Sequence, residues 1–131
     1  MRRVILESPY AGSVEEDVAY ARAAVRDSLL RGESPIASHL LYTQPGILRD
    51  GVPDERQLGI EAGLAWRFVT EASVVYQDLG ITPGMRLGIE AAEMAGVPVE
   101  YRNLGSFRTQ KGRAAKVAAR PLGDVVIHVA D

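Results

Sequence analysis

Cysteine is absent from the 131-residue chain, and only two histidines are present, His39 and His128. Without thiols the chain can form no disulfide, no thiolate metal site and no cysteine nucleophile. Two histidines so far apart in the sequence show no recognisable metal-ligand spacing, so we expect no bound metal ion and no cofactor. The lack of cysteine is also compatible with a reducing, cytoplasmic setting.

The net charge is small, and long apolar runs are lacking as well. The formal net charge of -2 produces no field that would draw the whole chain onto DNA or an anionic membrane. The first apolar run is only three residues, too short for a signal peptide, and no later run is long enough to cross a bilayer. We therefore expect an intracellular protein of one globular domain, residues 1–131, that binds neither membranes nor nucleic acid.

Short apolar runs of strand type are present at regular intervals. They predict strands at residues 4–6, 36–38, 72–76 and 97–101. Helical patterns separate them, at residues 13–32, 53–70 and 82–96. This alternation predicts an α/β fold, a three-layer sandwich with a mostly parallel, doubly wound sheet of four or five strands.

The helix boundaries are marked by capping residues. Ser13 can cap the first helix with Glu16 as its capping-box partner, and Thr82 can cap the third ahead of Pro83. The second helix should bury one stripe of apolar residues: Leu58, Ala62, Ala65 and Val69. Its two glycines, Gly59 and Gly63, lower helix propensity, which indicates a close approach to a neighbouring element.

The C-terminal segment, residues 102–131, is a basic extension. Between Arg102 and Arg120 it carries six basic residues and no acidic one, and residues 125–129 can form a fifth strand. The stretch between is either a loop with a short helix or a mobile arm. Phe107 beside Arg108 can stack a base, but a solvated segment is the commoner explanation of such a run.

Ligands of open α/β sheets bind beyond the carboxyl ends of the strands. Neither GxGxxG nor GxxxxGKS occurs, which excludes a dinucleotide fingerprint and a P-loop. Three loops remain, and they supply the candidate contacts Glu7, Ser8, Tyr10, Gly12, His39, Asp78, Gly84, Met85 and Arg86. The helix start at Thr82 can bind an anion together with Arg86, and Glu90 follows one turn later on the same face. Each of these residues also has a purely structural explanation. Arg86 and Glu90 can form a solvated pair on an exposed helix, Asp78 can be a turn former, and His39 can satisfy a backbone carbonyl in the core.

Several of these segments resemble the nucleoside 2-deoxyribosyltransferase-like superfamily, which includes the deoxynucleoside monophosphate N-glycosidases. The resemblance covers residues 4–101. Its carriers are the loop with Ser8, Tyr10 and Gly12, the passage at 71–76, the segment GITPGMRLGIEAA at 80–92 and AGVPV at 95–99.

The resemblance implies an enzyme that acts on the N-glycosidic bond of a nucleoside or nucleotide. The family's catalytic glutamate falls at the position of Arg86, and the nearest acid on that face is Glu90, with Asp78 or Glu7 as the second acid. The family completes its pocket across subunits, which implies a homo-oligomer. Because an arginine stands where the glutamate is expected, the alternative is a non-catalytic nucleotide-binding or sensing module on the same fold.

Overall fold

The computed structural model describes residues 1–10 and 14–105. The expected Ser13 cap, Gly12, the fifth strand and nearly all of the basic extension lie outside the described residues. The elements follow in the order β1 (Arg2–Glu7), α1 (Val14–Leu30), β2 (Glu33–Ile36), α2 (Ser38–Leu41), α3 (Pro53–Leu64), a 3-10 turn η1 (Ala65–Phe68), β3 (Ala72–Tyr76), α4 (Pro83–Met94) and β4 (Val99–Arg102). None of the helices in this part of the chain is long and apolar enough to cross a bilayer.

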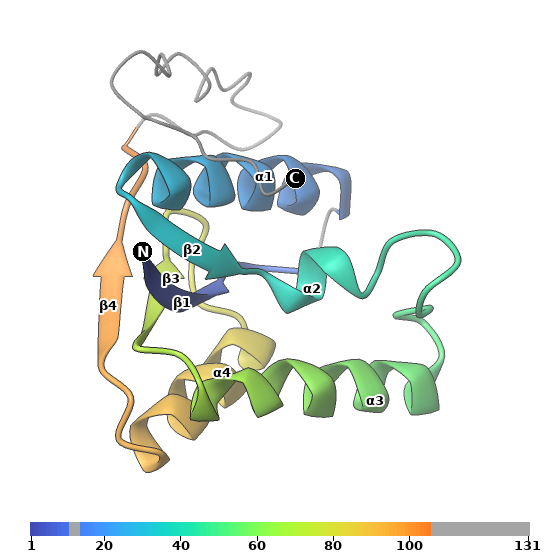
Figure 1. Ribbon diagram of the computed structural model, residues 1–131. Helices are drawn as coiled ribbons and strands as arrows, with labels where there is room; N and C mark the ends of the chain where they lie inside the picture. Colours follow the sequence, from blue (N-terminus) through green and yellow to red (C-terminus); the bar gives the residue numbers. More distant parts are fainter. Residues whose placement is uncertain (11–13, 106–131) are drawn as a thin grey trace, which may run out of the picture.

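The four strands form one parallel sheet in the order β2-β1-β3-β4. Helix α1 covers one face of this sheet, and α3 and α4 lie on the other (Figure 1). The chain starts in the middle of the sheet, moves out to β2 and crosses back to β3, as a doubly wound topology requires. The predicted α/β sandwich with a parallel sheet is confirmed.

Alternation along β1 divides its side chains between the two faces. Val4 and Leu6 join the core under α1 together with Tyr20, while Val75 packs with Met85 and Ile89 of α4 on the opposite side. Successive side chains of a strand point to opposite faces, so Glu7, which pairs with Val75, faces the α4 side. The last residue of β1 is therefore a carboxylic acid directed toward a helix.

The second strand begins three residues earlier than predicted. Residues 33–36 form β2, with Glu33 opposite Arg2 and Ile36 opposite Ile5, and Ser38 already belongs to α2. Pro35, which precedes the predicted strand, lies within the observed one. Because β2 is at the edge of the sheet, a missing amide hydrogen is tolerated there.

Buried polar groups under α1 connect β2, β3 and β4. Arg102 makes two hydrogen bonds to Glu33, at 2.7 and 2.6 Å, and Tyr76 donates to Asp27 at 2.7 Å. The Arg102 guanidinium lowers the pKa of Glu33. Helix α1 therefore buries Asp27 and Ser28 as well as Tyr20 and Ala24, a mixed face that apolar periodicity cannot reveal.

The predicted stripe of α3 is wrong. Leu58, Ala65 and Val69 are exposed, and the helix ends at Leu64 before one 3-10 turn. The face that packs inward carries glycines instead: a Cβ at Gly63 would overlap the Ser38 hydroxyl, and one at Gly59 would lie 3.2 Å from Leu48. The expected close approach at Gly59 and Gly63 is thus confirmed.

Candidate functional site

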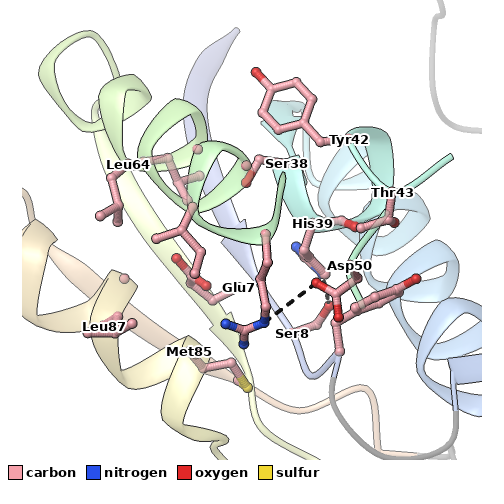
Figure 2. Close-up of a pocket in the computed structure, with 18 of the residues that line it drawn as sticks. Glu7, Ser8, Ser38, His39, Tyr42, Thr43, Asp50, Leu64, Met85 and Leu87 are labelled. Carbon is pink, nitrogen blue, oxygen red and sulfur yellow. Dashed lines mark hydrogen bonds and ion pairs between the residues drawn. The ribbon is translucent and has the colours of Figure 1, made fainter. Parts of the chain in front are cut away.

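A pocket of about 1030 Å³, including its open mouth, lies beyond the carboxyl end of β1. Helices α2, α3 and α4 and the loop before α3 surround it (Figure 2). Its wall from α3 is a helical stripe, Glu55, Arg56, Gly59, Ile60, Gly63 and Leu64, and its wall from α4 is a second one, Gly84, Leu87, Gly88 and Ala91.

Glu7 is the acid at the centre of this pocket. Its carboxyl group lies against α4, where a Cβ at Gly88 would stand 2.6 Å from Glu7 Cδ and so overlap the carboxyl group. Burial raises the pKa of Glu7 to about 8. A carboxyl group that lacks a partner in the described part of the chain and faces a pocket is a candidate for ligand contact or catalysis.

Ser8 and His39 form a hydrogen-bonded pair beside Glu7. The distance between Ser8 Oγ and His39 Nε2 is 2.6 Å, and Ser8 is only 4% exposed. Burial lowers the pKa of His39 to about 4, so its imidazole is neutral at physiological pH. The Tyr10 ring stands edge-on to this imidazole, with 6.4 Å between the ring centroids. Together these groups offer a hydroxyl, a neutral imidazole and an aromatic ring to a ligand.

Six of the predicted contact residues meet in this pocket. Glu7, Ser8, Tyr10, His39, Gly84 and Met85 all line it. Gly12 lies outside the described residues, and Asp78, Arg86 and Glu90 are not among the lining residues. The candidate contacts thus do not all share one cleft, because Asp78, Arg86 and Glu90 lie outside the pocket that Tyr10 lines.

Helical geometry explains where Arg86 and Glu90 lie. They share one face of α4, as their spacing predicts, but that face is exposed. Gly88, midway between them, faces Glu7, and two residues rotate a helix by about 200°. The shared face of Arg86 and Glu90 is thus turned away from the pocket.

The Asp78 carboxylate is hydrogen-bonded to groups outside the pocket. Its carboxylate accepts hydrogen bonds from the Tyr20 hydroxyl and from the backbone amides of Leu104 and Gly105, the amide bonds measuring 2.9 to 3.1 Å. Burial and this carboxylate both raise the pKa of Tyr20. Asp78 therefore anchors the chain after β4 to the loop after β3.

Sequence reasoning missed the contribution of α3 and of the loop before it. Asp50 of that loop and Arg56 of α3 line the pocket, as do Ser38 of α2 and Arg67 of the 3-10 turn. The signal that pointed there was the glycine pair of α3, which indicated a close approach without identifying the partner. Gly88 was also missed, because a glycine inside a helix gives no sign of the side chain it makes room for.

The comparisons agree with this architecture. A solved structure of a 2-deoxyribosyltransferase from the psychrotolerant bacterium Bacillus psychrosaccharolyticus superposes with a TM-score of 0.56 and 18% sequence identity, over 83% of this chain and 78% of that chain. At this identity the likeness shows a shared fold. No curated protein matches the sequence. A family model described as a domain of unknown function (DUF7768) matches residues 2–102, and the chain belongs to that family.

Proposed function

We propose that this protein breaks the N-glycosidic bond of a nucleoside-type substrate, by hydrolysis or by transfer of the sugar, with Glu7 as the catalytic carboxylate. The observation that carries the proposal is the Glu7 carboxyl group, which faces the pocket without a partner in residues 1–10 and 14–105. The fold shared with a deoxyribosyltransferase supports the same class of substrate.

The chemistry requires a carboxylate next to the anomeric carbon. As the bond from that carbon to the base nitrogen breaks, the sugar acquires oxocarbenium character, which the ionised Glu7 stabilises or traps as a glycosyl ester. The departing base takes a proton from water at the pocket mouth. The hydroxide left by that water then attacks the same carbon, or it takes the N–H proton of a second base that attacks in transfer. Either attack breaks the ester bond and releases the Glu7 carboxylate.

The neighbouring groups suit the positioning of a sugar and a base. The Ser8 hydroxyl and the neutral His39 imidazole line the pocket together with Glu7, and both groups can hydrogen-bond to sugar hydroxyls, which supports the proposal. Tyr10 presents an aromatic ring of the kind on which a base stacks. Proximity and fixed orientation of such groups lower the barrier even without a strong acid.

The proposal is tested by incubating the protein with a panel of nucleosides and nucleoside 5′-monophosphates and measuring the released base by chromatography. We expect release by the wild type, loss of about 100-fold or more in Glu7→Gln, and nearly full activity in Glu90→Gln, the matched control on the exposed face of α4. Because the ionised carboxylate reacts, kcat/KM should rise with pH, reach half of its maximum near the raised pKa of Glu7, about 8, and level off above it.

Two results would contradict this assignment. If Glu7→Gln retains activity and Glu90→Gln loses it, the catalytic carboxylate is Glu90. If no compound is turned over but a nucleotide binds equally well to wild type and Glu7→Gln, the protein is a binding module on the same fold.

A further inference from the structure

The charged side chains of the pocket differ in how closely they are bound by ion-pair partners. Glu55 is engaged from outside by Arg49, which does not line the pocket; the Arg49 amide and Nε bind its carboxylate at 2.7 and 3.0 Å. Among the described residues, Arg56, at the next position of α3, has only a distant partner. Its Nε lies 3.7 Å from Asp50 Oδ1, beyond hydrogen-bond length, and both side chains are nearly half exposed, at 47% and 42%.

Arg56 therefore carries a guanidinium whose donors are available. No hydrogen bond from Arg56 side-chain donors to another described residue is seen in the structure, and a guanidinium offers five of them in a planar fork. Asp50, at the end of the loop before α3, faces the same space as Glu7 and Ser8 (Figure 2), and the dashed line ending on it marks the ion pair with Arg56. An exposed pair of this length contributes little and is readily exchanged for a better acceptor.

We propose that Arg56 is the anion subsite of this pocket and that the anion is the phosphate of a nucleoside monophosphate. In the absence of ligand, the Asp50 carboxylate occupies the position of that phosphate. The nucleoside part of this assignment rests on the proposed function. A phosphate monoester carries two negative charges and accepts a bidentate pair of hydrogen bonds from arginine, so it outcompetes one carboxylate at 3.7 Å.

Arg67 is the second pocket arginine and serves as a comparison. Its guanidinium already donates to the Leu64 carbonyl at 2.6 Å and stacks on the Phe68 ring at 4.2 Å. It lies eleven residues after Arg56, about three helical turns along the same wall. Because Arg67 is already engaged and Arg56 is only weakly paired, the two arginines make separable predictions.

Calorimetric titration of the full chain with a monophosphate and with the matching nucleoside tests the subsite. The titrations use a Glu7→Gln background to prevent turnover. We expect the monophosphate to bind about tenfold more tightly or better, and Arg56→Gln to remove that preference while leaving nucleoside affinity unchanged. Asp50→Asn should increase the preference, because the competing carboxylate is gone. Arg49→Gln, which breaks the neighbouring ion pair of the same loop, should leave it unchanged.

Equal affinity of the two compounds, or a preference that survives Arg56→Gln and disappears in Arg67→Gln, overturns the assignment. Inorganic phosphate separates this proposal from the proposed function. If phosphate at constant ionic strength raises the Tm of the wild type but not of Arg56→Gln, the anion subsite holds even when no base is released. If base is released but neither phosphate nor monophosphate responds to Arg56→Gln, only the proposed function holds.

Discussion

Glu7 should make the protein less stable as the pH rises, and replacing it with glutamine should remove that loss. The pKa of Glu7 is about 8 in the folded protein, against 4.5 for the free side chain. Below pH 4.5 both folded and unfolded states hold the proton, so Glu7 contributes no pH dependence. Between pH 4.5 and 8 the unfolded state loses the proton while the folded state keeps it, which favours unfolding.

The size of the effect follows from the shift. Each pKa unit corresponds to about 1.4 kcal/mol, so the penalty reaches about 3 kcal/mol at pH 7 and about 5 kcal/mol above pH 8. Glutamine occupies a similar volume and cannot ionise. Relative to the wild type, Glu7→Gln should therefore gain stability with rising pH up to pH 8 and no further. Both values are large against a total stability of roughly 5–15 kcal/mol.

Urea unfolding of both proteins at pH 5, 7 and 9 measures this difference. The difference between variant and wild type cancels the titration of every other group that the substitution leaves unperturbed. A gap that stays constant from pH 5 to 9 would show that Glu7 titrates near its ordinary pKa and would refute the reasoning from burial. A gap that grows as the pH falls would give the shift the opposite sign.

Two further predictions concern the same pocket. Burial lowers the pKa of His39 from 6.5 to about 4. As the pH falls from 6.5 to 4, the free energy of unfolding of the wild type should therefore drop by about 3 kcal/mol relative to that of His39→Gln, as measured by the same unfolding experiments. A difference between the two proteins that does not change with pH would contradict this. Gly88→Ala should displace the Glu7 carboxyl group and reduce base release by about tenfold or more, whereas Gly84→Ala, where a Cβ meets nothing closer than 3.9 Å, should not. Equal activity of the two alanine variants would show that contact with α4 does not position Glu7.

Local sequence patterns determined the α/β class and most element positions. The strand at 72–76 and the start of α4, with Thr82 accepting a hydrogen bond from the Met85 amide at 3.2 Å, are found where the sequence predicted them. Apolar runs, proline at a first helical position and a capping hydroxyl act over a few residues, so their effect is readable without the rest of the chain. The rule that ligands bind beyond strand ends correctly selected Glu7, Ser8, Tyr10 and His39 as neighbours of one pocket.

Only the tertiary structure decided which faces meet. The spacing of Arg86 and Glu90 predicted a shared helical face but carried no information about which neighbour that face meets, and α4 turns it to solvent. The inward face is instead the one where Gly88 makes room for Glu7, a contact between residues 81 positions apart. The first residue of β2, Glu33, likewise pairs with Arg102, 69 residues away. Side-chain periodicity describes one element at a time, whereas burial, pKa shifts and pocket walls arise from packing between elements distant in sequence.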